Sequence, residues 1–383
     1  MSTPRERLTS DGFSWHAHVC AYRHRDRTTG SDSMSTHGIR RLPVTALIAG
    51  LTVALVVVSV LALMLGAVHI PWRATVGFLW AELTGGVVVA ADIAEYRIVV
   101  DSRLPRVVLA AAVGAGLGAV GLLVQAMVRN ALADPYVLGI SSGASVGATA
   151  VVLFGAFGAL GVYALSSAAF AGALGATVLV YLMARSSTGL VPLRLVLTGT
   201  AVGYGFSATT TVLVFMAPHG DAARSVMFWL LGSLAGAGWQ MVPLVVTVAV
   251  VGLAIVAAFA RQLNALSMGD EISAALGLNA SRFRLLLFVV SAAMTGCFVA
   301  VCGAIGFVGL VVPHVARLLV GADHRRLILV TPLLGAVFLV TADLVARILL
   351  PPQELPLGAV TAAVGVPVFV LLMRRRGAMS GGG

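Results

Sequence analysis

The residue pattern most suggestive of chemistry in this chain is a serine between two glycines. Gly139, Ser141 and Gly143 match Gly-x-Ser-x-Gly, the sharp turn that presents a nucleophilic serine in many hydrolases. That turn needs a strand before it, and the apolar sequence around it does not predict one. An intramembrane serine protease with His314 as its base is therefore a remote alternative, because a membrane histidine is more often a packing or hydrogen-bonded residue.

The sequence contains nothing that would bind and hydrolyse ATP. All 25 basic residues are arginine, whereas a phosphate-binding loop of the type Gly-x-x-x-x-Gly-Lys-Ser/Thr requires lysine. We therefore expect that the chain is not an enzyme and uses no cofactor. If ATP drives the protein, a separate nucleotide-binding subunit must hydrolyse it.

Metal binding has little support either. The zinc-protease motif His-Glu-x-x-His is absent from the sequence. His16, His18, Cys20 and His24 lie near one another in the N-terminal region, but no second pair of ligands follows to complete a coordination geometry. We expect a polar tail there and no metal site.

The composition places these residues in a membrane. Hydrophobic residues make up 59% of the 383 residues and charged residues only 10%, and the mean hydropathy is +1.00. Soluble domains carry about 25% charged residues. The apolar runs suit spanning helices of about 20 residues and lack the period of two that a β-barrel requires. We expect an all-α polytopic membrane protein with about ten transmembrane helices.

Three regions differ in composition. Residues 1–40 are polar, which predicts a disordered tail, and Met34 is an alternative start of translation. Residues 41–376 form the membrane domain, and residues 377–383 a flexible C-terminal tail. The expected spans are about 43–68, 107–128, 136–156, 161–183, 195–216, 241–260, 285–303, 306–320, 327–349 and 358–373.

Arginine positions predict the orientation in the membrane. With both termini in the cytoplasm, most arginines fall in inner loops, as the positive-inside rule requires, so the net charge of +10 does not call for a nucleic-acid partner. Segment 69–106 is then outside, where Trp72 and Trp80 suit a helix at the membrane interface. Segment 261–284 is inside. The related arginine patterns before the spans at 107 and 285 would fit an inverted repeat.

Two segments keep polar side chains at membrane depth. Residues 129–147 and 303–326 combine glycine-rich apolar stretches with polar and charged side chains. Such side chains are costly in lipid and must face protein or water. An ion-coupled secondary transporter would need acidic residues at the midplane, and the single clear candidate, Asp343, falls toward the outer end of its span. That makes this alternative a remote one.

These two segments, with RLPR, WLLGSLAG, LNALSMGDE and ELPLG in the same order, closely resemble the FecCD-type permeases. That family supplies the membrane subunits of ABC importers for iron–siderophore complexes, haem and cobalamin. The resemblance covers about residues 43–376. It implies a bundle in the inner membrane of a bacterium, forming the pathway as a homodimer or as a heterodimer with a paralogous permease. It also implies an ABC ATPase dimer beneath and an extracytoplasmic solute-binding protein above.

The resemblance further implies alternating access and a cargo. Iron–siderophore complexes are the commonest cargo of the family, so we expect a ferric siderophore here, with cobalamin or haem as the alternatives. The family motifs are shared among these cargoes, and specificity lies largely in the binding protein. The sequence of the permease therefore does not identify one siderophore.

The inner segment 261–284 resembles the family's coupling loop, which seats against the ATPase. It predicts two short helices broken at a glycine, with acidic residues near a helix start, where they complement the helix dipole. Ile272, Leu276 and Leu278 would form an apolar face for a groove on a partner; an ordinary solvated loop is the alternative. The expected coupling residues are Ser267, Met268, Gly269, Asp270, Glu271, Ala275, Leu276 and Gly277.

The outer arginines have two candidate roles. In the cobalamin-importer branch of the family, arginines at the matching positions receive acidic residues of the solute-binding protein, which implies docking by Arg103, Arg106 and Arg347. Asp343 lies four residues before Arg347, so an ion pair within one helix is a competing role. Snorkelling of the side chains to lipid headgroups is another.

The resemblance also implies that the turn after the span at 107–128 flanks the pathway near its cytoplasmic gate. Residues there can cap or break helices and supply hydroxyl groups. The expected pathway or gate residues are Asn130, Asp134, Pro135, Ser141, Ser142, Gly143 and Ser145.

Overall fold

The computed structural model describes residues 43–186, 189–217 and 219–380, so the predictions for residues 1–40 and for the last three residues lie outside this part of the chain. The described residues are mainly helical, which confirms the all-α prediction. One short antiparallel pair, β1 (Arg185–Ser186) and β2 (Gly189–Leu190), lies between the predicted spans 161–183 and 195–216.

Each of the ten predicted spans coincides with a helix, because long apolar runs satisfy their backbone hydrogen bonds internally. The helices at the predicted spans are α1 (Val44–Met64), α4 (Leu104–Val128), α5 (Ile140–Phe154), α6 (Ala164–Ala184), α7 (Pro192–Phe215), α9 (Val242–Ala258), α12 (Ala280–Cys302), α13 (Val308–Val320), α14 (His324–Ile348) and α15 (Leu357–Ser380).

Fewer of these helices meet the length and composition of a membrane span on their own. Among the described residues, five helices do, or six if α9 and the helix that follows it after a 61° bend count as one span. Three apolar helices are shorter: α5, α13 and the first part of α15. The number of ten spans and the location of the termini remain predictions.

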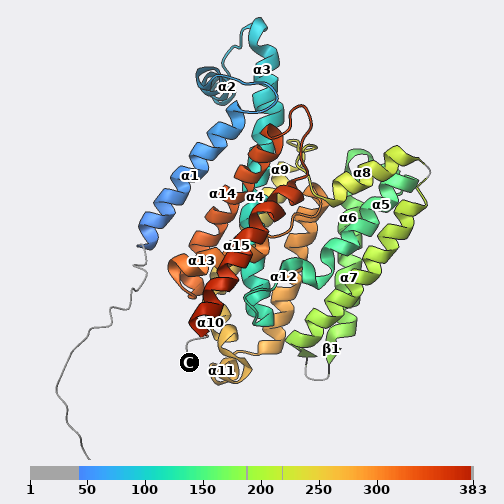
Figure 1. Ribbon diagram of the computed structural model, residues 1–383, viewed down its shortest axis with the longest axis vertical. Coiled ribbons are helices and arrows are strands. Elements are labelled where there is room, and N and C mark those ends of the chain that lie inside the picture. The colour runs from blue at the N-terminus through green and yellow to red at the C-terminus, as the bar shows by residue number, and fades with distance from the viewer. Residues whose placement is uncertain (1–42, 187–188, 218, 381–383) are drawn as a thin grey trace, which may run out of the picture. The chain divides into compact units, whose positions relative to one another are not determined.

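Short helices lie at the two ends of the bundle (Figure 1). At one end, α2 and α3 follow α1; at the other, α10 and α11 connect α9 to α12. The short elements are α2 (Trp72–Thr84), η1 (Ala90–Asp92), α3 (Ile93–Arg97), η2 (Ile98–Arg103), η3 (Pro135–Leu138), η4 (Gly158–Tyr163), α8 (Gly220–Leu230), α10 (Ala260–Met268) and α11 (Asp270–Ala275).

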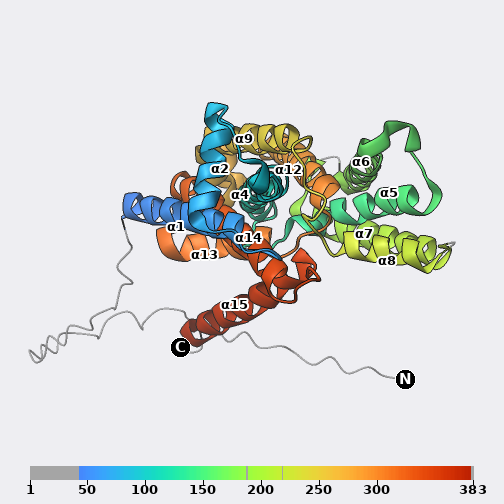
Figure 2. The ribbon, with the colours of Figure 1, turned by 90° about the horizontal axis from the view of Figure 1, so that it is seen from above.

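Helix α4 lies at the centre and is buried along most of its length. Glycines on α4 allow the backbones of neighbouring helices to approach closely, as in membrane bundles generally. A Cβ atom added at Gly114 would lie 2.3 Å from the carbonyl oxygen of Gly335 on α14. One added at Gly121 would lie 2.0 Å from the carbonyl oxygen of Gly309 on α13. Figure 2 shows α4 end-on with other helices around it.

Candidate functional site

The end of the bundle opposite to α2 carries a helical hairpin formed by α10 and α11. Gly269 separates the two helices with φ 123° and ψ 166°, a backbone conformation that is essentially restricted to glycine. The buried hydroxyl of Ser273 lies 3.0 Å from the carbonyl oxygen of Ala265 and 2.7 Å from that of Gly269, which ties α11 to α10. Gly277, with φ 77°, ends α11. The predicted pair of short helices broken at glycine is confirmed.

The hairpin exposes large apolar side chains. Met268 is 66% exposed, Ile272 44% and Leu276 67%. Leu278, predicted to lie on the same face, instead packs against the main core, because the chain turns inward after Gly277. The apolar surface of the hairpin is therefore formed by Met268, Ile272 and Leu276, and it is available to a partner.

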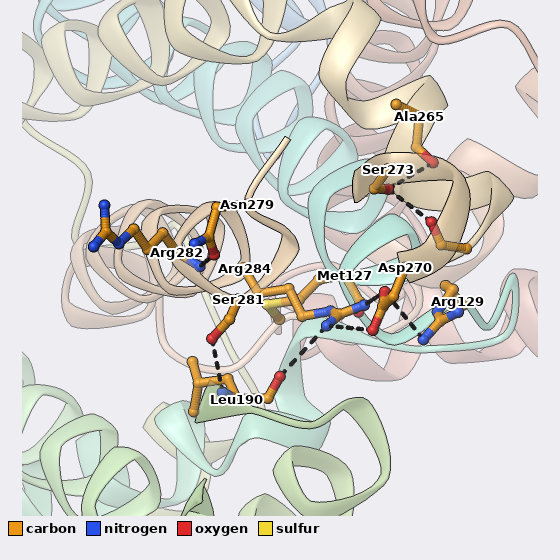
Figure 3. Close-up of polar contacts among 11 residues, drawn as sticks. Met127, Arg129, Leu190, Ala265, Asp270, Ser273, Asn279, Ser281, Arg282 and Arg284 are labelled. Carbon is orange, nitrogen blue, oxygen red and sulfur yellow. Dashed lines mark hydrogen bonds and ion pairs between the residues drawn. The ribbon is translucent and has the colours of Figure 1, made fainter. Parts of the chain in front are cut away.

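Asp270, the first residue of α11, is held by two arginines (Figure 3). Arg284 on α12 donates from Nη1 to the Asp270 Oδ2 atom at 3.1 Å and from Nη2 to Oδ1. Arg129, at the end of α4, lies 3.4 Å from the same Oδ1 atom. The hydrogen bonds from Arg284 hold the pKa of Asp270 below its ordinary value, so this carboxylate is ionised at neutral pH.

Arg284 connects four elements, and sequence reasoning did not select it. Its side chain is 3% exposed. Besides Asp270 on α11, Nε lies 3.4 Å from the Met127 carbonyl oxygen on α4, and Nη1 lies 3.5 Å from that of Leu190 on β2. The sequence did contain a signal for this burial. Arg284 shares a helical face with Leu287 and Phe288, both of which are buried.

A second contact ties the hairpin to α14. Asn264 on α10 donates from Nδ2 to Oδ1 of Asp323 at 2.7 Å and accepts from the backbone N–H of His324 at 2.9 Å. Asp323 in turn caps α14 by accepting from the Arg325 N–H at 3.0 Å. The hairpin is thus attached to α12 on one side and to α14 on the other.

A cavity of about 450 Å³ opens beside the ion pair of Asp270 and Arg284. It lies between the α6–α7 turn, α11 and the start of α12, and its lining includes Leu190, Asp270, Ser281 and Arg284. Figure 3 shows Ser281 directed at Leu190, whose N–H donates to the Ser281 Oγ at 3.3 Å. The cavity places charged and polar side chains next to the exposed hairpin.

The turn between α4 and α5 holds the second predicted site. Asp134 caps η3 by accepting from the Tyr136 N–H at 2.8 Å, and Asn130 accepts from the Leu132 N–H at 2.9 Å. The Tyr136 hydroxyl donates to the Ile305 carbonyl oxygen at 2.9 Å and accepts from the Ile305 N–H at 2.8 Å. Tyr136 therefore joins this turn to the segment before α13, a role that the sequence did not reveal.

The predicted pathway residues separate into two groups. Asp134 and Ser142 line a cavity of about 460 Å³ together with Tyr204 and Ser207 of α7, and Ser207 donates to the Ser142 hydroxyl at 3.3 Å. The cavity lining also includes Tyr136, Gly203, Phe307 and Leu310.

Of the other predicted pathway residues, Asn130 is exposed and the rest face protein. A Cβ atom at Gly143 would lie 2.4 Å from the carbonyl oxygen of Gly172, so Gly143 serves the close contact of α5 with α6. Ser145 donates to the Ser141 carbonyl oxygen at 2.9 Å within α5, and both serines are buried. Pro135 is buried, and its ring would be 2.6 Å from a Cβ atom at Gly309.

The local structure around Ser141 is not that of a hydrolase. Ser141 lies in the first turn of α5, and the helical turn η3 precedes it. The strand that must lead into a nucleophile elbow is missing from this described segment. The Gly-x-Ser-x-Gly pattern here is a helix start.

The three outer arginines are buried near the opposite end of the bundle. Arg103 donates to the carbonyl oxygens of Leu63 at 2.6 Å and Met64 at 2.9 Å, where α1 ends. Arg106 lies 2.8 Å from Asp343, and Arg347 lies 3.1 Å from the same carboxylate, so the ion pair within α14, the competing role for Arg347, is present.

The cluster formed by Arg106, Asp343 and Arg347 reaches toward the surface through Arg106. Arg106 also contacts Glu354, in the loop after α14, at 3.0 Å. The side chain of Glu354 is 34% exposed, whereas that of Asp343 is 1% exposed. Arg106 and Arg347 neutralise Asp343, which disfavours Asp343 as the ion site of a secondary transporter.

Comparison with known proteins agrees with the resemblance seen in the motifs. The model of the FecCD transport family matches residues 54–375. The cobalamin import system permease protein BtuC of Halobacterium salinarum is 42% identical, over 80% of this chain and 80% of its own length. The Fe(3+) dicitrate transport system permease protein FecD of Escherichia coli is 37% identical, over 86% of this chain and 98% of its own.

Two further similarities extend this result. The hemin transport system permease protein HmuU of Yersinia pestis is 37% identical, over 86% of this chain and 96% of its own. Among solved structures, an inward-facing metal-chelate type ABC transporter has a TM-score of 0.75 and 31% identity, over 86% of this chain and 99% of that one.

Proposed function

The chain belongs to the FecCD transport family, whose members are permease subunits of ABC importers, and we propose that it forms the pathway for a ferric siderophore. Four similar proteins are named as permeases for iron chelates: FecD, FhuB, YfmE and YfmD. Their shared chemistry supports an iron complex as cargo. Cobalamin is the second candidate, because the permease BtuC is 42% identical to this chain; haem, the cargo named for HmuU, is the third.

The observation that carries the proposal of ATP-driven transport is that the α10–α11 hairpin is exposed and is attached to α12 and α14. In the proposed mechanism a separate ATPase subunit binds the apolar surface of Met268, Ile272 and Leu276, as an amphipathic helix binds a groove. Movement of the ATPase displaces α11. The ion pair between Asp270 and Arg284 then passes the displacement to α12, since the buried arginine is fixed within the bundle.

The contacts of the hairpin continue to the gate. Arg284 and Arg129 both lie next to the end of α4, and the turn that follows leads to Tyr136. Tyr136 binds Ile305 before α13. Helices that respond to the ATPase thus share contacts with the cavity lined by Asp134, Ser142 and α7. Alternating access would open this cavity to one side at a time.

The pathway itself requires a second permease, either another copy or a paralogue. The exposed side of α7 carries Thr200, Ser207 and Thr211 among large apolar side chains such as Leu197 and Phe215, and Thr200 and Ser207 line the cavity described above. A water-filled pathway between two such surfaces would keep polar side chains out of lipid. This supports placing the pathway along α7.

Docking of a solute-binding protein stays part of the proposal. Arg106 is the docking cation that the geometry favours, because its partner Glu354 is partly exposed on a loop at the outer end. An acidic residue of a binding protein would compete with Glu354 for Arg106. Arg103 and Arg347 hold the surrounding structure in place: Arg103 binds the end of α1, and Arg347 binds Asp343.

Uptake in cells tests the proposal. A bacterial strain that lacks this permease but keeps its partners would receive the full chain, and entry of radioactive iron would be measured for a panel of ferric siderophores. ATP-dependent uptake of one complex supports the proposal. Restoration of cobalamin or haem entry alone would keep the importer mechanism and replace the cargo.

A further inference from the structure

Helix α2 carries large apolar side chains on a side that, among the described residues, no other element covers. Trp72, Val76, Trp80 and Leu83 are exposed, with Trp80 at 68% and Leu83 at 81%. Their spacing of four, four and three residues places them along one side of the helix. We call these four residues the α2 stripe.

The opposite side of α2 is already packed. Thr75 and Phe78 are buried, and Phe78 belongs to a small core with Ile70, Val99 and Val100. This core fixes α2 against η2. The α2 stripe is therefore not needed to hold α2 in place, and its exposed area calls for another explanation.

The direction of α2 differs from that of the bundle. Figure 1 shows α4 lengthwise and α2 close to end-on, and Figure 2, turned by 90°, shows α4 end-on and α2 lengthwise. Helix α2 thus lies across the bundle, at the end opposite to α10 and α11. In a protein that spans a membrane, a helix in this position runs along the membrane plane.

The chemistry of the α2 stripe matches the headgroup region of a bilayer. Tryptophan is enriched there because its ring is apolar and its N–H is polar. The guanidinium carbon of Arg73 lies 5.6 Å from the centroid of the Trp72 ring, which places a cation where lipid phosphates would be. Helix α1, which leads into α2, exposes Val57 and Leu61, and Val68 in the connection is exposed as well, so exposed apolar side chains follow the chain from the span to α2.

We propose that α2 is an interfacial helix whose stripe inserts into the outer leaflet at headgroup level. Lipid is favoured over a protein partner because the stripe is apolar and joins the lipid-facing surface of α1. The inserted helix would fix how deep α1 lies in the membrane. It would thereby fix the position of the end of α1, which Arg103 binds.

Fluorescence quenching tests this directly. Full-chain variants would keep one tryptophan each, with phenylalanine at the other positions, and would be reconstituted in phosphatidylcholine vesicles with bromine either near the headgroups or near the midplane. Retained Trp80 should be quenched severalfold more by shallow bromine than by deep bromine, and little by aqueous iodide. Trp229 is the control, because it packs against the main core and is less exposed than Trp80.

Two results would overturn the proposal. Iodide quenching of Trp80 without bromine quenching would place the stripe in water and leave it to a protein partner. Quenching by neither would mean that protein covers Trp80. If the single-tryptophan chains do not fold, the difference between the native chain and Trp80→Phe gives the same information. The readout does not involve transport, so it is independent of the proposed function.

Discussion

Arg284 and Asp270 form a two-point ion pair that joins the start of α12 to the exposed α10–α11 hairpin at the end of the bundle. Charge-assisted pairs with two contacts are directional as well as strong. The arginine is 3% exposed and the aspartate 47%, so the pair connects the interior to the surface. A displacement of α11 would therefore reach α12 without being absorbed by a flexible loop.

Replacing the arginine should uncouple transport from ATP hydrolysis. In Arg284→Gln, Asp270 would keep only Arg129, and the two-point contact would be lost at a cost of about 1–3 kcal/mol. We expect uptake to fall while the partner ATPase continues to hydrolyse ATP. The measurement is cargo transported per ATP in proteoliposomes.

Arg282→Gln is the matched control for this variant, because Arg282 lies two residues earlier on the same helix and is exposed. It should transport as the native chain does. If Arg284→Gln and Arg282→Gln gave equal coupling ratios at equal expression, the ion pair would have no part in coupling.

The same pair predicts how coupling depends on pH. Arg284 lowers the pKa of Asp270, so the stabilisation is fully present above the ordinary aspartate value of about 4 and is lost only as the pH falls through the lowered value. Titration of Asp270 should therefore not change the amount of cargo transported per ATP between about pH 5 and pH 8. A titration within that range that disappears in Asp270→Asn would contradict the assignment.

The proposed gate leads to a separate prediction, for the variant Tyr136→Phe. Loss of the hydroxyl leaves both the N–H and the carbonyl oxygen of Ile305 without this partner, which costs about 1–3 kcal/mol for each group that stays buried. We expect a lower unfolding temperature and leakage of cargo without ATP. Tyr204→Phe is the control, since Tyr204 lines the same cavity but is 75% exposed. Equal leakage in the two variants would exclude the hydroxyl as part of the gate.

Close packing of α4 gives a prediction about stability. Gly121→Ala would place a methyl group 2.0 Å from the Gly309 carbonyl oxygen, so α13 must move away from α4. Overpacking of this kind costs about 1–3 kcal/mol or more. Gly175→Ala on α6 is the control, because no atom lies within 4 Å of its added Cβ. Thermal unfolding in detergent would compare them; similar midpoints would contradict the close contact.

Local patterns predicted much of this structure. Hydropathy predicted where the helices lie, since each apolar run forms its own backbone hydrogen bonds. The break at Gly269 was also predictable, because glycine followed by two acidic residues is typical of a helix start. The intrahelical pair of Asp343 and Arg347 follows from their spacing of four residues.

Contacts between distant parts of the sequence were not predictable in this way. Tyr136 and Ile305 are 169 residues apart, and Arg106 and Asp343 are 237 apart. No local periodicity encodes such pairs. For the same reason Arg284 contributed to the orientation of the chain as one more inner arginine. Its helical face is shared with buried residues, but its partners on α4, β2 and α11 became apparent only in the structure.

The most direct test of the central claim is uptake of radioactive iron, presented as a panel of ferric siderophores, by a strain that lacks the native permease but carries its partners and this chain. We predict ATP-dependent accumulation of one complex with the native chain and little accumulation with Arg284→Gln. Absence of uptake for every ferric siderophore, haem and cobalamin, with the chain expressed and in the membrane, would contradict it.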